Sequence, residues 1–236
     1  MTNRFEGKTA LVAGGTGGLG RAVSLALAQE GARVSVTYRS EEELQSLRAA
    51  AGTSASSLTG FRADVTNEKE VSAVVQKIGS LDILVNAVGG YAGGTALWET
   101  TADTFDRMML LNVRSGFVLA RVVVPAMVRR GSGSIVNISS RAAVDHAAGA
   151  SAYAASKAAA VAMMDSLGAD VLGKGVRVNT VLPSIIDTEA NRKAMPGADF
   201  AKWPKPEEIA RVILFLCSED AKLIHGASVP VYGANG

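Results

Sequence analysis

The stretch "TALVAGGTGGLGRAVSLALAQEG" (9–31) decides the fold, because it joins an apolar run, a glycine-rich turn and an amphipathic helical pattern. Glycine lets the backbone turn sharply and lets a pyrophosphate approach its amide groups, and the helix that follows presents unpaired N–H donors. Glycines also serve packing alone, but this placement between a strand and a helix predicts a dinucleotide-binding turn. The turn has the pattern G-x-x-x-G-x-G, and its expected cofactor contacts are Gly14, Thr16, Gly18, Leu19 and Gly20.

Short β-branched runs alternate with helical patterns along the rest of the chain. The runs occupy 8–14, 32–38, 58–64, 81–87, 133–139, 176–182 and 227–233. Strict alternation of strand and helix predicts a doubly wound parallel β-sheet with helices on both faces. No repeat, linker or low-complexity segment interrupts it, so we expect one α/β domain over residues 1–236 with about seven strands.

Composition excludes several classes of function. The 24 basic and 22 acidic residues leave a net charge of +2, and the basic residues are scattered, so no nucleic-acid surface is expected. The first residues are polar and no apolar run reaches the ~18–20 residues of a membrane span, which predicts a soluble protein without a targeting segment. The single Cys217 fits a buried thiol in a reducing cytoplasm. Two histidines and no acidic or histidine cluster predict no metal site.

The end of the second predicted strand should select the nucleotide. An acidic residue there binds a ribose 2′-hydroxyl, whereas an arginine suits a 2′-phosphate. The chain places Tyr38, Arg39 and Ser40 at this point, with no acid before Glu41. Arg39 is alternatively a solvated residue at a strand end. The pattern favours NADP(H) and leaves NAD(H) possible.

Tyr153 and Lys157 stand four residues apart on a predicted helix, so they share one face. A neighbouring ammonium is expected to lower the pKa of the phenol towards the range of a general acid. Such a pair also occurs by chance, but two further polar residues accompany it. Ser140, after the strand 133–139, is expected to hold a carbonyl oxygen, and Asn112 to orient a water beside Lys157. The structural alternatives are a strand-end cap for Ser140 and a helix kink for Asn112.

Taken in order, these motifs resemble the short-chain dehydrogenase/reductase family over nearly the whole chain. The set comprises the glycine turn, Asp64-Val65, "VNAVG" (85–89), Asn112, Ser140, Tyr153-x-x-x-Lys157 and "LPSIIDT" (182–188). The resemblance implies a single-domain Rossmann fold and NAD(P)-dependent hydride transfer, with Tyr153 as proton donor and Ser140 orienting the substrate. It implies that Lys157 lowers the tyrosine pKa and holds the nicotinamide ribose, and that Asn112 maintains the proton relay. Further cofactor contacts implied are Asp64, Val65, Asn86, Ala87, Val88, Tyr153, Lys157, Pro183, Ser184, Ile186 and Thr188.

The chain departs from the family pattern at Ala13, Ala87 and Ser184, none of which removes a catalytic group. The resemblance also implies a homotetramer or a homodimer, with the helices around 103–130 and 151–173 as interface candidates.

Two segments are expected to form the substrate site: a short lid at about 187–205 and a wall at 88–99. Their candidate substrate contacts, together with Ser140, are Tyr91, Trp98, Asn191, Met195 and Trp203. Both segments are similar to those of dihydropteridine reductases, a branch of the same superfamily. That similarity implies a quinonoid dihydropterin, unless the shared residues only fix the backbone of the lid.

Arg39 and Ser140 fit the reduction of a small carbonyl better, namely a ketone, an aldehyde or a 3-oxoacyl compound. We therefore expect a carbonyl reductase, with dihydropteridine reductase as the alternative. A regulator that senses the nucleotide without turnover is less favoured, because all four catalytic residue types are present.

Overall fold

The computed structural model describes residues 3–233, and its seven-stranded parallel sheet confirms the predicted fold class. The strands are β1 (Thr9–Ala13), β2 (Arg33–Tyr38), β3 (Leu58–Arg62), β4 (Ile83–Asn86), β5 (Gly133–Ile138), β6 (Val176–Pro183) and β7 (Ser228–Val231). Their order in the sheet is β3-β2-β1-β4-β5-β6-β7, and every neighbouring pair is parallel. The order reverses between β1 and β4, which is where doubly wound sheets bind their ligands.

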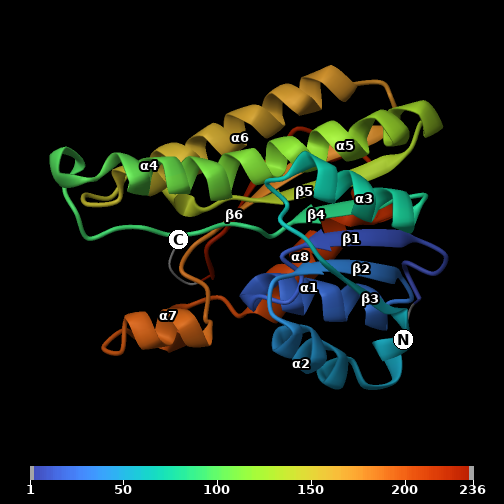
Figure 1. Cartoon of the computed structure of the whole chain (residues 1–236), viewed down its shortest axis with the longest axis horizontal. Helices are drawn as coiled ribbons and strands as arrows, with labels where there is room; N and C mark the ends of the chain where they lie inside the picture. Colours follow the sequence, from blue (N-terminus) through green and yellow to red (C-terminus); the bar gives the residue numbers. More distant parts are fainter. Residues whose placement is uncertain (1–2, 234–236) are drawn as a thin grey trace.

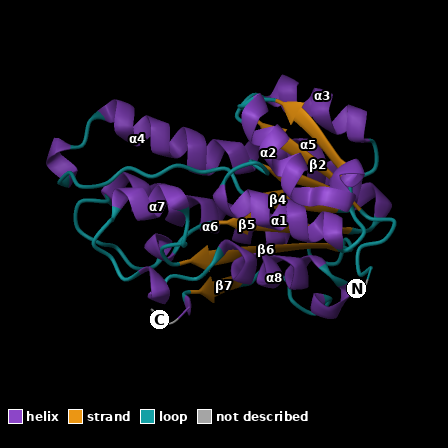
Figure 2. Cartoon of the chain, turned by 90° about the horizontal axis from the view of Figure 1, so that it is seen from below, coloured by secondary structure: helices purple, strands orange, loops and turns teal. Residues whose placement is uncertain are grey.

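Helices cover both faces of the sheet (Figures 1 and 2). One layer holds α1 (Gly18–Gln29), α2 (Glu41–Ala51) and α8 (Pro206–Cys217), and the other holds α3 (Glu68–Ile78), α5 (Ser115–Arg130) and α6 (Ser151–Val171). Alternate residues of β1 enter the two resulting cores: Val12 packs in the first and Leu11 in the second. Helices thus shield both faces of the sheet from water, which explains why several strands are almost continuously apolar.

The helix α4 (Ala102–Met109) continues through a π-helical turn (Leu110–Arg114) into α5. Over Ala102–Arg130 this is the one helix within residues 3–233 that is long and apolar enough to cross a membrane, by length and composition alone. The sequence prediction had found no such run. Of its apolar window, 44 % is buried, and side chains such as Val123 and Met127 belong to the second core.

Candidate active site

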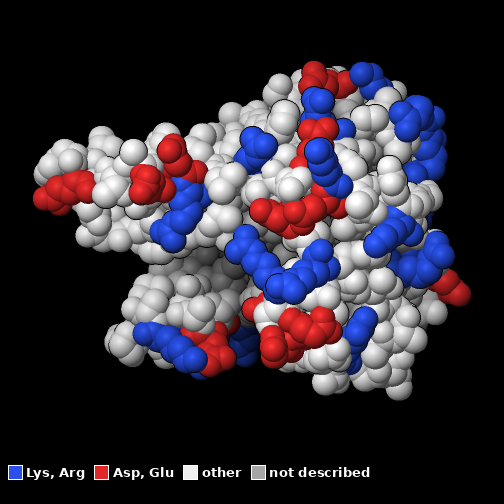
Figure 3. All heavy atoms as spheres, in the orientation of Figure 1, with Lys and Arg blue, Asp and Glu red and all other residues white. Residues whose placement is uncertain are grey.

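The predicted site residues gather beyond the carboxyl ends of the strands. The glycine-rich turn follows β1, Ser140 follows β5, and the lid follows β6 and contains α7 (Glu189–Ala194). Figure 1 shows α4 and α7 projecting past this edge of the sheet. The surface is hollowed between them, and Lys and Arg side chains gather at the inner end of the hollow (Figure 3). The hollow has the position of a ligand site and a charge that suits an anion.

The glycine turn has a backbone that other residues would not allow. Gly14 has a φ of +71°, and a Cβ on Gly20 would stand 2.2 Å from the carbonyl oxygen of Gly14. At Gly18 a Cβ would stand 3.2 Å from Cγ2 of Thr188, in the lid. The backbone amides therefore stay uncovered by side chains, as the binding of a pyrophosphate requires.

Tyr153 and Ser140 face each other in the site. Their side chains are hydrogen-bonded, and the Ser140 hydroxyl also accepts a hydrogen bond from the amide of Ala142 at 3.2 Å. Burial raises the pKa of the Tyr153 phenol, and the bond to Ser140 opposes that increase. The phenol is consequently protonated near neutral pH and able to donate its proton.

Lys157 is 6 % exposed, and its Nζ donates to the carbonyl oxygen of Ile138 at 3.3 Å. Burial lowers the pKa of Lys157 to about 8. Its Nζ lies 5.9 Å from the centre of the Tyr153 ring. Burial of the phenol is the largest influence on the pKa of Tyr153, and a lowering of that pKa by Lys157 stays a prediction.

The side chain of Asn112 makes several hydrogen bonds within the protein. Its Oδ1 accepts from the amide of Gly90 at 2.9 Å, and its Nδ2 donates to the carbonyl of Gly90 at 3.1 Å and to Oγ of Ser156 at 2.9 Å. Both amide hydrogens have acceptors, while Oδ1 accepts one bond and keeps a second lone pair, so the expected role of Asn112 in orienting a water stays a prediction. The Asn112 side chain thus connects the loop after β4 to α6, and the π-helical turn that contains Asn112 places it between them.

Each hydroxyl predicted to contact the adenosine end of the cofactor is bonded to a glutamate in the first turn of α2. Thr16 Oγ1 donates to Glu43 Oε2 at 2.8 Å. The Tyr38 phenol bonds to Glu41, and Ser40 Oγ donates to Glu42 and accepts from the amide of Glu43 at 3.4 Å. Arg39 is exposed, and its guanidinium makes no hydrogen bond or ion pair within residues 3–233.

The predicted cofactor contacts Asp64, Val65 and Asn86 bond or pack within the protein itself. The Asp64 carboxylate accepts from the amide and hydroxyl of Thr66 at 2.9 and 2.8 Å, and these bonds lower its pKa. Val65 is buried in the second core. Asn86 is 2 % exposed and accepts from the amide of Val88 at 3.2 Å. These residues shape the turns that line the site.

The loop after β4 lies directly against the glycine turn. A Cβ on Gly14 would meet Val88 Cγ2 at 3.1 Å, and one on Gly20 would meet the Cβ of Ala87 at 3.2 Å. After β6, Ser184 Oγ donates to the carbonyl of Tyr232 at 2.9 Å, and Ile186 packs against the first core. Pro183 is buried at the end of β6.

The lid has its own internal packing, closed at its neck by a bond from the amide of Asp187 to the carbonyl of Pro204 at 3.0 Å. Arg192 makes two hydrogen bonds to Asp187 and lies 4.9 Å over the ring of Phe200. Phe200 packs against Trp203 with the two rings tilted by 52° and their centres 5.0 Å apart. Arg192 thus links the neck to the aromatic pair.

Two of the predicted substrate contacts belong to this packing. Trp203 is 7 % exposed. Asn191 Nδ2 donates to the carbonyl of Ile186 at 2.8 Å, and its amide donates to Thr188 Oγ1 at 3.2 Å. In this structure both residues hold the backbone of the lid, which is the alternative that the sequence left open.

The remaining substrate candidates have different surroundings. The ring of Tyr91 meets Tyr153 edge-on, with centres 5.0 Å apart, and is 66 % exposed. Trp98 is 85 % exposed on the same loop, and Met195 is half-buried at the end of α7. Tyr91 is thus the candidate that reaches the proton donor.

Known proteins share this arrangement. Residues 8–199 match the family described as short chain dehydrogenase. The chain is 33 % identical to the 3-oxoacyl-[acyl-carrier-protein] reductase FabG of Thermotoga maritima over 98 % of each protein. It is also 33 % identical to D-threitol dehydrogenase of Mycolicibacterium smegmatis, over 98 % of this chain and 93 % of that protein.

The chain belongs to the short-chain dehydrogenase/reductase family. A solved short chain dehydrogenase/reductase superposes with a TM-score of 0.90 at 33 % identity, covering 98 % of this chain and 99 % of the other. ElxO with NADP bound gives 0.89 at 26 % identity, covering 97 % and 98 %. Family membership makes the protein an NAD(P)-dependent oxidoreductase, as the sequence predicted.

For this dehydrogenase, Ser156 is a site residue that the sequence did not reveal. It is completely buried, accepts from Asn112 and donates to the carbonyl of Tyr153 at 2.8 Å. Gly89 is a second one, since a Cβ there would stand 2.8 Å from Asn112 Oδ1 and 3.1 Å from Lys157 Nζ. Ser156 is one small residue among alanines, so the sequence carries no signal for this role.

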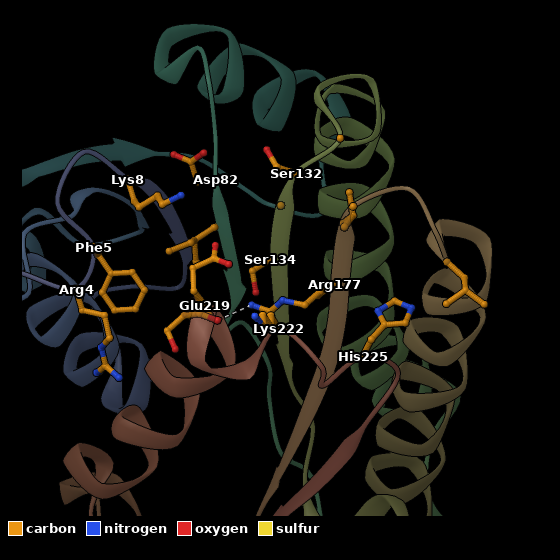
Figure 4. A pocket seen from close by; sticks show the side chains of 18 of the residues that line it. Arg4, Phe5, Lys8, Asp82, Ser132, Ser134, Arg177, Glu219, Lys222 and His225 are labelled. Atoms are coloured by element: carbon orange, nitrogen blue, oxygen red, sulfur yellow. Dashed lines mark hydrogen bonds between the residues drawn. The ribbon is translucent and has the colours of Figure 1, made fainter.

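A cavity of about 460 Å³ lies at the opposite end of the sheet (Figure 4). Arg177 crosses it and donates to the carbonyls of Leu216 at 2.7 Å and Ser218 at 3.0 Å, at the end of α8. Burial raises the pKa of the Cys217 thiol to about 12, so it is not a nucleophile. Residues 3–233 hold no group of three or more His, Cys, Asp or Glu able to bind a metal.

Proposed function

We propose that this oxidoreductase reduces a small carbonyl compound, a ketone, aldehyde or 3-oxoacyl compound, to the alcohol. The observation that carries the proposal is the hydrogen-bonded pair of Ser140 and Tyr153 hydroxyls at the carboxyl edge of the sheet. Two adjacent hydroxyls suit one carbonyl oxygen, because one can donate a hydrogen bond while the other transfers a proton.

When bound, the nicotinamide cofactor supplies the hydride that adds to the carbonyl carbon. Tyr153 then transfers its hydroxyl proton to the carbonyl oxygen, and Ser140 holds that oxygen with a hydrogen bond. Burial keeps Tyr153 protonated, so that it can donate its proton, and lowers the pKa of Lys157 to about 8, so that the ammonium can exchange a proton near neutral pH. Asn112 and Ser156 position the helix that carries both groups.

The turn Gly14–Gly20 and Lys157 fit a dinucleotide, and we propose NADP(H) as the favoured cofactor, with NAD(H) possible. Arg39 supports this preference, because an exposed arginine at the end of β2 suits a 2′-phosphate. A relative of known structure, ElxO, was solved with NADP. Leu19, Val88, Pro183, Ser184, Ile186 and Thr188 complete the proposed cofactor contacts.

Tyr91, Trp98 and Met195 are proposed to line the substrate pocket, with Asn191 and Trp203 contributing through the shape of the lid. The lid residues Asn191 and Trp203, on which the similarity to dihydropteridine reductases rests, make contacts within the lid itself. The similarity therefore does not require a pterin, and a carbonyl remains the proposed substrate. We further propose a homotetramer or homodimer in the cytoplasm. Exposed Phe105 and Phe117 on α4 and α5 support an interface there, at 44 % and 48 % exposure.

A substrate panel tests this proposal. Oxidation of NADPH and NADH is followed with ketones, aldehydes, 3-oxoacyl thioesters and, separately, freshly made quinonoid dihydropterin. Turnover of a carbonyl that falls about 100-fold in Ser140→Ala supports the proposal, since removal of one hydrogen-bond donor to a developing oxyanion costs about that much. Turnover of the dihydropterin alone, or no loss in Ser140→Ala, contradicts it.

A further inference from the structure

Three consecutive glutamates open α2, beside the one arginine expected to bind a 2′-phosphate. Glu41, Glu42 and Glu43 are exposed, and each bonds to a hydroxyl on the predicted adenosine side of the site. Glu43 differs from the other two. Its partner, Thr16, lies 27 residues away in the glycine-rich turn, whereas Glu41 and Glu42 bond to the neighbouring Tyr38 and Ser40.

The bond between Thr16 and Glu43 spans the two segments that would enclose the adenosine ribose. In doubly wound nucleotide-binding folds, the glycine turn holds the pyrophosphate and the end of the second strand contacts the ribose 2′ position. Thr16 belongs to the first segment, and Glu43 begins the helix directly after the second. The Glu43 carboxylate, at 2.8 Å from Thr16 Oγ1, therefore lies beside the 2′ position, opposite Arg39 in charge.

A 2′-phosphate and a 2′-hydroxyl respond to this carboxylate in opposite ways. The hydroxyl of NADH can donate a hydrogen bond to a carboxylate, while the phosphate of NADPH is repelled by it. The carboxylate also holds the Thr16 hydroxyl, which would otherwise be free to donate to a phosphate. Arg39 and Glu43 thus act against each other at a single position.

We propose that Glu43 determines cofactor selectivity by holding down the preference for NADPH that Arg39 creates. The proposal rests on the proposed function, in that the turn at Gly14–Gly20 binds a nicotinamide dinucleotide. The ratio of the affinities for NADPH and NADH would then be controlled by one side chain that lies outside the glycine motif and outside residues 38–40.

The test is the pair of dissociation constants for NADPH and NADH, measured by calorimetry on the full chain without substrate. Glu43→Gln removes the charge and keeps an oxygen that accepts from Thr16, so the fold is preserved. We expect NADPH to bind about 10-fold more tightly and NADH to change less than about 3-fold, as for the loss of one partly screened like charge. Glu207→Gln, an exposed glutamate in the first turn of α8, serves as the matched control and should change neither constant.

Salt separates a charge effect from a change in structure. Repulsion between exposed charges is screened, so the gain in NADPH affinity should shrink at high ionic strength. An unchanged ratio of the two constants in Glu43→Gln overturns the inference and leaves the oxidoreductase proposal standing. If the wild-type protein binds neither nucleotide, the proposed function itself fails.

Discussion

Replacing Lys157 by methionine should abolish turnover and yet stabilise the protein. Lys157 has its ordinary pKa of 10.5 in the unfolded chain and a pKa of about 8 in the fold, because burial disfavours the charged form. At about 1.36 kcal/mol per pKa unit, this difference costs the folded state about 3 kcal/mol below pH 8. The hydrogen bond from Lys157 to the carbonyl of Ile138 offsets about 1 kcal/mol of this cost, and methionine cannot make it.

The sign of the pH dependence follows from proton counting. Between pH 8 and 10.5 the unfolded chain binds the proton of Lys157 and the folded protein does not, so the stability of the wild type rises with pH in this window. Lys157→Met should therefore be more stable by about 2 kcal/mol at pH 7; this advantage should shrink through the window and reverse near pH 10.5, where the lost hydrogen bond outweighs what is left of the burial cost.

Urea unfolding followed by circular dichroism, at equal protein concentration and at several pH values, measures this difference. Lys77→Met, an exposed lysine on α3, is the matched control and should show no pH-dependent gain. If Lys157→Met is less stable than the wild type at pH 7, the assignment of a desolvated, poorly compensated ammonium is wrong.

Three further variants test other parts of the structure. Ser156→Ala should lower kcat about 10-fold with an unchanged Kd for NADPH, because it removes the hydrogen bonds of Ser156 to Asn112 and to the carbonyl of Tyr153 and so misplaces Tyr153. Ser166→Ala, at an exposed position of the same helix, should leave kcat unchanged. Arg177→Met should lower the free energy of unfolding by about 3 kcal/mol in urea titrations, since it removes two hydrogen bonds from a charged, half-buried guanidinium to the end of α8. Asp187→Asn should raise KM for the carbonyl more than it lowers kcat, and should speed proteolysis within the lid, because the ion pair with Arg192 closes it.

Local patterns were sufficient to predict the order of the elements. The strands are short apolar runs, and the inner strands β1, β4, β5 and β6 are buried on both faces by the helices that the alternation requires, while the edge strands β3 and β7 are partly exposed. The Ser140, Tyr153 and Lys157 set was also accessible, because its spacing and its place after a strand are themselves the signal.

Features that depend on partners distant in the sequence were not predictable in this way. Asn112 reaches Gly90 across 22 residues and Ser156 across 44, so neither the hydrogen-bond partners of its amide nor the role of Ser156 has a local signature. The direction in which the pKa of Tyr153 is shifted depends on burial of the phenol, which the spacing of residues along one helix does not reveal. In the lid, Trp203 is an aromatic residue in a polar loop, and only its packing on Phe200 separates a structural role from a ligand contact.

The most direct test of the central claim is NADPH oxidation by Tyr153→Phe with the best carbonyl from the panel, beside a titration of NADPH binding to the same variant. Phenylalanine keeps the ring and its contact with Tyr91 but cannot donate a proton. The account predicts NADPH binding within about 3-fold of the wild type and a loss of kcat of at least about 100-fold, the usual scale of a general acid. Retention of most of the activity would show that another group protonates the carbonyl oxygen and would contradict the mechanism.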